Sequence, residues 1–264
     1  MPHTMTPDGI TIAYQVRGEG AAAPLLLLAG QSNDHHWWDS VRDDFHGDRS
    51  TMTFDYRGTG ASDKPDMPYS TELFALDAIA VLDALGVERA DVYGTSMGGR
   101  VAQQLAARHP DRVRALVLGC TSPGGPHAVE RTNDVRRSLV QTQPGAARQA
   151  LLELMYTPGW LAANPGPYRT LGDPGMPAHA RRRHLVAGNQ HDAWQLLPGI
   201  GAPTLVVHGT DDLLNPAANA PLLADRIPGA RLRLIPGARH AYFEENRAVA
   251  SPLVLDFLTT VQDP

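Results

Sequence analysis

The sequence has little cysteine, few aromatic residues and fewer basic than acidic residues. Its single cysteine, Cys120, cannot form a disulfide within the chain, so the fold does not depend on an oxidising compartment. With 23 Lys and Arg against 28 Asp and Glu, the formal charge is −5, which disfavours a nucleic-acid partner. The longest apolar run, residues 24–29, is far shorter than the roughly 20 residues of a membrane span, and the first ten residues lack the basic and apolar regions of a secretory signal. We therefore expect a cytoplasmic protein with no membrane or nucleic-acid partner.

What is present is the pattern of an α/β protein. Hydrophobic residues make up 42% of the chain and charged residues 19%, as in an ordinary globular domain. Short apolar runs alternate with segments of helical periodicity, which predicts a mostly parallel sheet with right-handed crossovers. The expected strands cover residues 10–16, 25–29, 50–54, 90–93, 113–119, 204–208 and 232–235, and the expected helices cover residues 70–85, 98–108 and 252–261.

One long segment interrupts this alternation. Between residues 122 and 201 the chain is rich in Pro, Gly, Arg and His, and helix-like pieces at 146–155 and 178–187 replace the expected strands. We interpret 122–201 as a helical cap inserted into a core formed by residues 1–121 and 202–264. The basic run at 181–183 is typical of a solvated helix face.

A nucleophile is suggested by Gly94-Thr95-Ser96-Met97-Gly98, which fits the pattern G-x-S-x-G between an expected strand and an expected helix. In that context the turn is tight and strained, only small neighbours fit, and the serine hydroxyl is raised above the sheet edge. The alternative is a glycine-rich turn with an incidental serine, but the strand–turn–helix context favours the nucleophile.

A serine hydroxyl needs a general base, and a carboxylate to orient that base. Among eleven histidines, His240 follows an expected strand end, where α/β sheets carry their active sites. His208 lies inside a strand and His109 at a helix end, which favours structural roles for both; an exposed loop position is the alternative for His240. The acid comes from the loop after residue 208, where Asp211 and Asp212 both qualify on these grounds.

Four motifs, in order, resemble those of the α/β-hydrolase superfamily: Asp55 to Ser62 (DYRGTGAS), Gly94 to Gly99 (GTSMGG), Gly209 to Pro216 (GTDDLLNP) and Gly237 to His240 (GARH). The resemblance covers nearly the whole chain outside the cap. It implies an eight-stranded, mostly parallel sheet flanked by helices, and a triad of Ser96, Asp212 and His240 with Asp211 as a surface neighbour. It also implies structural roles for Asp55 and Arg57. Within the superfamily the chain is similar to esterases and lactonases near 3-oxoadipate enol-lactonase and to the prolyl iminopeptidase-like group.

The resemblance also indicates where an oxyanion would bind. The backbone N–H of Met97 follows the nucleophile, and Gln31 aligns with the residue that supplies the second N–H. Here the chain departs from the family, which often has His-Gly where this sequence has Ala29-Gly30. Trp38 falls where relatives often place a substrate-side tryptophan. His35 and His36 could reach the site, although packed or solvated positions are favoured.

These residues predict a serine hydrolase that cleaves an ester or lactone of a small, largely apolar molecule. The cap tryptophans Trp160 and Trp194 are candidate substrate contacts, with simple packing as the alternative. No metal-ligand spacing or dinucleotide fingerprint is present, so we expect no metal and no cofactor. The alternatives are a C–C bond hydrolase or iminopeptidase-like enzyme with the same triad, and a receptor or non-hydrolytic biosynthetic protein on this fold. The sequence does not indicate the oligomeric state.

Overall fold

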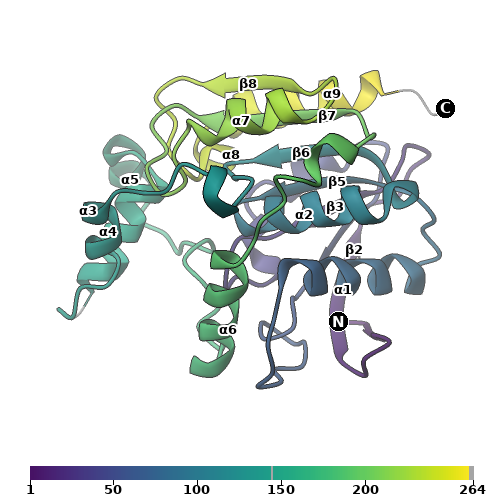
Figure 1. Ribbon diagram of the computed structural model, residues 1–264, viewed down its shortest axis with the longest axis horizontal. Coiled ribbons are helices and arrows are strands. Elements are labelled where there is room, and N and C mark those ends of the chain that lie inside the picture. The colour runs from purple at the N-terminus through teal and green to yellow at the C-terminus, as the bar shows by residue number, and fades with distance from the viewer. Residues whose placement is uncertain (144, 262–264) are drawn as a thin grey trace.

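The central element is an eight-stranded sheet with strand order β1-β2-β4-β3-β5-β6-β7-β8, seen in the computed structural model, which describes residues 1–143 and 145–261 (Figure 1). β2 pairs antiparallel with β1 and β4, and all other neighbours pair parallel. The expected mostly parallel sheet is therefore confirmed. The strands are β1 (His3–Met5), β2 (Thr11–Arg17), β3 (Leu25–Leu28), β4 (Thr51–Phe54), β5 (Ala90–Thr95), β6 (Val113–Gly119), β7 (Thr204–Gly209) and β8 (Arg231–Ile235).

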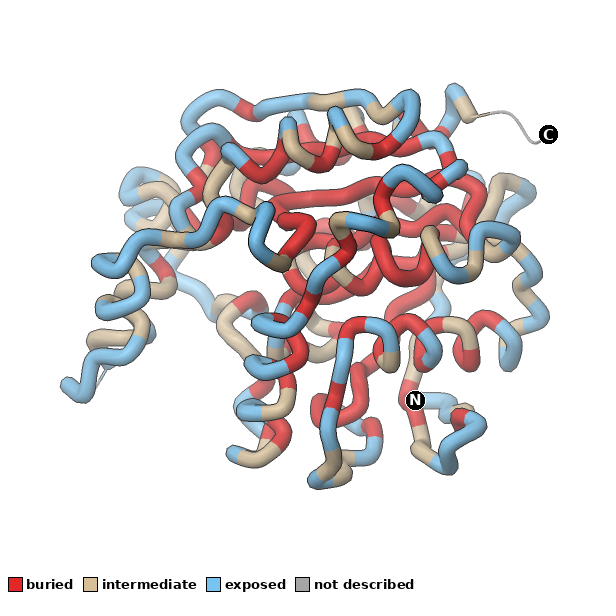
Figure 2. Tube along the Cα trace, viewed as in Figure 1, coloured by how far each residue is buried: buried red, intermediate tan, exposed pale blue. Residues whose placement is uncertain are grey.

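Helices cover both faces of this sheet. Figure 1 shows α1 (Thr71–Ala84), α2 (Met97–Arg108) and α7 (Asn219–Arg226) on the near face, with α8 (Tyr242–Glu245) and α9 (Arg247–Thr260) behind it. Every residue of β3 to β7 is buried, as expected for strands covered on both sides (Figure 2). The Ser70 hydroxyl caps α1 by accepting the Leu73 N–H at 3.0 Å, and this fixes the helix start as the sequence predicted.

Three elements differ from expectation. The closing helix begins at Arg247, so the predicted start at 252 is wrong, and Pro252 lies inside α9. Proline removes one backbone hydrogen bond, but an apolar face that includes Val254 and Leu258 is buried on both sides of it. The edge strand β1 and the helix α7 were not predicted, because β1 has three residues and little apolar alternation.

Between β6 and β7, the described residues form helices and no strand of the main sheet. The helices are α3 (Asn133–Ser138), α4 (Ala146–Met155), α5 (Pro158–Ala163) and α6 (Ala178–Asn189). In Figure 1, α3, α4 and α5 project together as an arm, while α6 lies nearer α1. The His184 side chain fixes α6 to the core, with its Nε2 2.9 Å from the Arg57 carbonyl oxygen. The cap boundaries at 122 and 201 remain a prediction.

The longest described helices, α1 and α9, have 14 residues each. Within residues 1–143 and 145–261, no helix combines the length and apolarity needed to cross a membrane. The cytoplasmic location stays a prediction.

A buried ion pair anchors the loop after β4. The Arg57 guanidinium donates to both carboxylate oxygens of Asp77 on α1, at 2.8 and 2.5 Å, and to Asp8 at 2.8 Å. The side chains of Arg57 and Asp77 are fully buried. These contacts hold the loop that begins at Asp55, in keeping with the structural role expected for Arg57.

Replacing Asp77 by alanine should lower the free energy of unfolding by about 3–5 kcal/mol, because the substitution leaves a buried guanidinium without its main partner. Urea denaturation checks this value. The matched control is Asp83→Ala on the same helix, whose exposed carboxylate pairs with Arg112 and should contribute at most about 1 kcal/mol. Equal losses for the two variants would contradict the role assigned to Asp77.

Candidate active site

Ser96 occupies a strained turn between β5 and α2. Its φ of 55° and ψ of −119° lie outside the usual regions for a side-chain-bearing residue. A Cβ at Gly94 would lie 2.2 Å from the Gly98 carbonyl oxygen, and a Cβ at Gly98 would lie 2.1 Å from the Leu28 carbonyl oxygen. Only glycine fits at these two positions. The turn raises Ser96, which is half-buried, at the carboxyl end of β5.

Asp212 and His240 form a hydrogen-bonded pair at the neighbouring strand ends. The Nδ1 of His240 lies 2.8 Å from Oδ2 of Asp212, and both side chains are buried. Because an ionised carboxylate only accepts hydrogen bonds, Nδ1 carries the proton and Nε2 is left to accept one. Burial alone would raise the pKa of Asp212, but the charge of His240 and the hydrogen bonds from His208 and His240 outweigh it and lower the pKa to about 2. The carboxylate is therefore ionised at any ordinary working pH.

Two further residues hold this carboxylate, and sequence reasoning missed both contacts. The Asn215 N–H donates to Oδ1 of Asp212 at 2.8 Å, and Nε2 of His208 lies 3.1 Å from Oδ2. His208 was expected to be structural because it lies inside a strand; it is buried in β7, yet it touches the acid. Asn215 could have been found, because an Asp side chain commonly accepts the backbone N–H two or three residues later in turns and capping contacts. Asp211 is exposed, as expected.

Ser96, Asp212 and His240 all follow the carboxyl ends of parallel strands: β5, β7 and β8. Within the described residues the Ser96 hydroxyl makes no hydrogen bond to His240. In enzymes without a bound substrate such contacts are often long and tighten only in the complex. The end of α4 holds the histidine loop, since the Ala241 N–H donates to the Met155 carbonyl at 2.9 Å.

The backbone N–H groups of Gln31 and Met97 are both without an acceptor among residues 1–143 and 145–261. Met97 is the first residue of α2, where N–H groups have no partner within the helix. The Gln31 loop is held from the cap, because the Asp173 N–H donates to the Ser32 carbonyl at 2.7 Å. Gln31 also lines a cavity of about 650 Å³ against α6.

The three tryptophans expected near substrate lie in different surroundings. Trp38 is fully buried, with its ring centroid 4.9 Å from that of Tyr93. Trp160 stacks on Tyr156 of the cap at 4.2 Å, and Trp194 stacks on His127 at 4.3 Å. Each ring is thus packed against another aromatic ring, and substrate contact by any of them stays a prediction.

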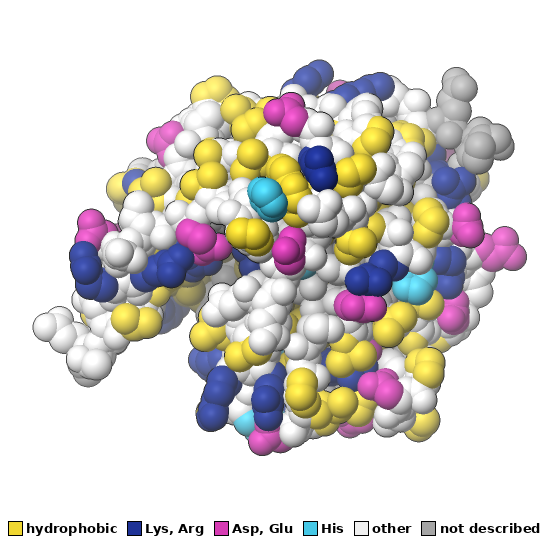
Figure 3. Space-filling view, in the orientation of Figure 1, with side chains coloured by type: hydrophobic (Ala, Val, Ile, Leu, Met, Phe, Trp, Pro, Cys, Tyr) yellow, Lys and Arg dark blue, Asp and Glu magenta, His cyan; other side chains and the backbone are white. Residues whose placement is uncertain are grey.

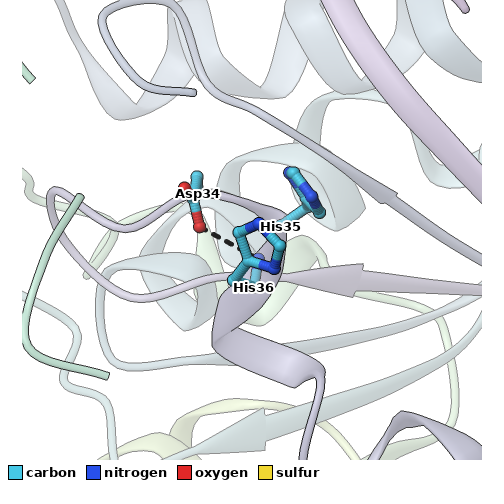
Figure 4. A group of neighbouring side chains, drawn as sticks. All are labelled: Asp34, His35 and His36. Carbon is cyan, nitrogen blue, oxygen red and sulfur yellow. Dashed lines mark hydrogen bonds between the residues drawn. The ribbon is translucent and has the colours of Figure 1, made fainter. Parts of the chain in front are cut away.

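A small polar cluster follows Gly30. Figure 4 shows Asp34, His35 and His36, whose potential ligand atoms lie within 4.8 Å of one another. Asp34 accepts the His36 N–H at 3.0 Å, and the Nδ1 atoms of His35 and His36 lie 2.7 and 2.5 Å from Asp55 and Asp39. These bonds tie the loop to the end of β4, so we assign the cluster to holding the loop. This agrees with the packed positions favoured for the two histidines.

Comparisons with known proteins bear on the fold and the family of the chain. A family model described as the alpha/beta hydrolase fold matches residues 23–161 and 167–247. "Putative carbamate hydrolase RutD" from Azorhizobium caulinodans is 30% identical, covering 97% of this chain and 98% of that one. The 2-hydroxymuconate semialdehyde hydrolase of Pseudomonas sp. strain CF600 is 32% identical, covering 94% and 90%. The crystal structure of the enol-lactonase from Burkholderia xenovorans LB400 superposes with a TM-score of 0.84, at 26% identity, covering 98% and 100%. The expected fold and the resemblance to esterase- and lactonase-like proteins are thereby confirmed, and the chain belongs to the α/β-hydrolase fold family.

Proposed function

We propose that the protein is a serine hydrolase that cleaves a carboxylic ester or lactone of a small molecule, with Ser96 as nucleophile, His240 as base and Asp212 as the orienting acid. The observation that carries the proposal is the hydrogen bond between Nδ1 of His240 and Asp212, which directs Nε2 of the neutral imidazole to act as the acceptor, together with the strained turn at Ser96. Enol-lactonase and semialdehyde hydrolase relatives support hydrolytic chemistry on this fold.

In this mechanism Nε2 of His240 takes the Ser96 proton as the hydroxyl oxygen attacks the substrate carbonyl. The oxyanion accepts hydrogen bonds from the Met97 and Gln31 N–H groups. His240 then gives its proton to the leaving oxygen, and an acyl-enzyme forms. Water, deprotonated by the same nitrogen, attacks the acyl group and releases the acid.

A C–C bond hydrolase is the second candidate, because the semialdehyde hydrolase is 32% identical over nearly the whole chain. The iminopeptidase reading is disfavoured by the loop after β3, which lacks the His-Gly-Gly-Pro-Gly pattern of that group. Comparison of 4-nitrophenyl butyrate with a vinylogous 1,5-diketone as substrates separates ester from C–C hydrolysis.

The nucleophile can be tested directly with a fluorophosphonate probe. We expect one equivalent of probe to attach covalently to the peptide that contains Ser96, because the phosphonyl group mimics the tetrahedral intermediate. Mass spectrometry of the digested protein checks the site. Labelling at another serine, or none under conditions where a known serine esterase reacts fully, would refute the assignment.

A further inference from the structure

Two arginines beside the proposed triad lack a carboxylate partner. Arg100 lies on α2 one turn beyond Ser96, and its terminal nitrogens donate to the Gly188 carbonyl at 2.6 Å and to the Ser122 hydroxyl at 2.9 Å. Both acceptors are uncharged. Arg100 and Arg131 are both half-buried, and a guanidinium group partly removed from water is favoured by a nearby anion, which neither has as a direct partner among the described residues.

The second arginine is Arg131. A chain of hydrogen bonds through two asparagines connects the segment before it to the loop of Asp212. The Asn215 N–H donates a hydrogen bond to Asp212. The side-chain oxygen of Asn215 accepts one from the Asn219 amide at 3.2 Å. Asn219 in turn exchanges two hydrogen bonds of 2.8 Å with the backbone of Val129. Arg131 follows two residues after this anchored position. Burial lowers its pKa, and the charge of Asp212 is close enough to oppose that lowering.

The charge of Glu130, and for Arg131 also that of Asp212, offsets only part of the effect of burial on the pKa of these two arginines. Burial, and then repulsion from Arg131, lower the pKa of Arg100 to about 10; burial also lowers the pKa of Arg131. Neither has a carboxylate oxygen within 4 Å in the part of the chain that the structure describes. Asp212 already accepts three hydrogen bonds, and Glu130 pairs with Arg136 at 2.9 Å.

The cavity that Gln31 lines is basic as well. Arg181 and Arg182 line it together with Gln31, and neither forms an ion pair in the described ranges, whereas Arg183 pairs with Asp66. Figure 3 shows a hollow between the projecting arm and the lobe that contains α6, with basic side chains on both sides. The formal net charge of the whole chain is −5, so the excess of positive charge from these arginines is confined to this region. Residues 181–183 were expected to form a solvated helix face, and two of them, Arg181 and Arg182, also line this cavity.

We propose that the substrate carries a carboxylate and that Arg131 binds it, with Arg100 adding positive charge behind. Arg131 makes the direct contact because both terminal nitrogens of Arg100 are already engaged. The substrate class is then an ester or lactone of a small molecule that also bears a free carboxylate. This inference rests on the proposed function and narrows its substrate, and it replaces the largely apolar substrate expected from the cap.

The test uses ester pairs that differ in one charge. One pair, 4-nitrophenyl hydrogen glutarate and 4-nitrophenyl valerate, places the carboxylate on the acyl chain; the other, 4-acetoxybenzoate and phenyl acetate, places it on the leaving group. We expect Arg131→Gln to lower kcat/KM for the charged member of at least one pair by about 10- to 100-fold, and for the neutral members by less than about twofold. Arg131→Lys should retain part of the preference.

The matched control is Arg137→Gln, which removes an exposed arginine from the same segment, paired with Asp134, and should leave every ratio unchanged. A second measurement needs no variant: glutarate should inhibit the wild-type enzyme competitively, and uncharged glutaramide should not. Equal effects of Arg131→Gln on charged and neutral esters, or equal inhibition by the two compounds, would overturn the inference. Failure of the proposed function is a separate outcome, recognised by the absence of both neutral-ester turnover and fluorophosphonate labelling.

Discussion

Replacing Ser96 by alanine is expected to reduce kcat for ester hydrolysis by at least about 10⁴-fold, because no acyl-enzyme can form without the hydroxyl. Residual catalysis would come from substrate binding and from the N–H groups of Met97 and Gln31. The fold should persist, since within the described residues the Ser96 side chain makes no hydrogen bond and alanine tolerates the positive φ no worse than serine. Initial rates with 4-nitrophenyl butyrate, together with the melting temperature, check both statements.

Ser138→Ala is the matched control. Ser138 lies in the cap helix α3, where its hydroxyl donates to the Val135 carbonyl at 2.9 Å, far along the chain from the strand ends. Its removal should change kcat by less than about twofold, as is usual for a surface substitution. A Ser96→Ala enzyme with more than a tenth of wild-type activity would show that another group attacks the substrate.

The sheet could be predicted from the sequence because its strands are short apolar runs bounded by turn residues. The strands predicted at residues 25–29 and 90–93 correspond to β3 and β5, in which every residue is buried. The G-x-S-x-G turn was equally readable, because the close contacts at Gly94 and Gly98 allow no other residue. These features depend on residues that are neighbours in the sequence, so they can be recognised from the sequence alone.

The surroundings of the proposed triad could not be predicted in the same way. The segment before Arg131 is joined to the acid loop through Asn219 and Asn215, which bond to residues about 90 positions away along the chain. In the sequence Arg100 is an ordinary helix residue, and only the folded structure shows its hydrogen bond to the Gly188 carbonyl. Contacts of this kind depend on how the cap segment returns to the core, and no periodicity in the sequence encodes that path. The sequence likewise does not show whether His208 only packs in the strand or also forms a hydrogen bond with Asp212, because that depends on how the chain folds back.

The second large effect on activity is expected from changing Asp212, the proposed acid of the triad. Asp212→Asn should lower kcat by on the order of 10⁴-fold with the fold intact. Oδ1 of Asp212 accepts from the Asn215 N–H, and Oδ2 accepts from both His240 and His208. An asparagine has a single acceptor oxygen. If that oxygen keeps the Asn215 bond, the amide NH₂ faces Nδ1 of His240, which must then give up its proton. The proton moves to Nε2, the nitrogen that has to accept from Ser96.

Asp211→Asn is the matched control, since the neighbouring carboxylate is exposed and accepts a hydrogen bond from the Thr210 hydroxyl at 2.9 Å. It should leave kcat within about twofold of wild type, whereas the melting temperatures of both variants should stay close enough to exclude unfolding at the assay temperature. Equal losses in the two variants would place the acid elsewhere. A full loss in Asp212→Asn alone, with slow fluorophosphonate labelling retained at Ser96, would show that the carboxylate acts by fixing the histidine tautomer and not by supplying the nucleophile.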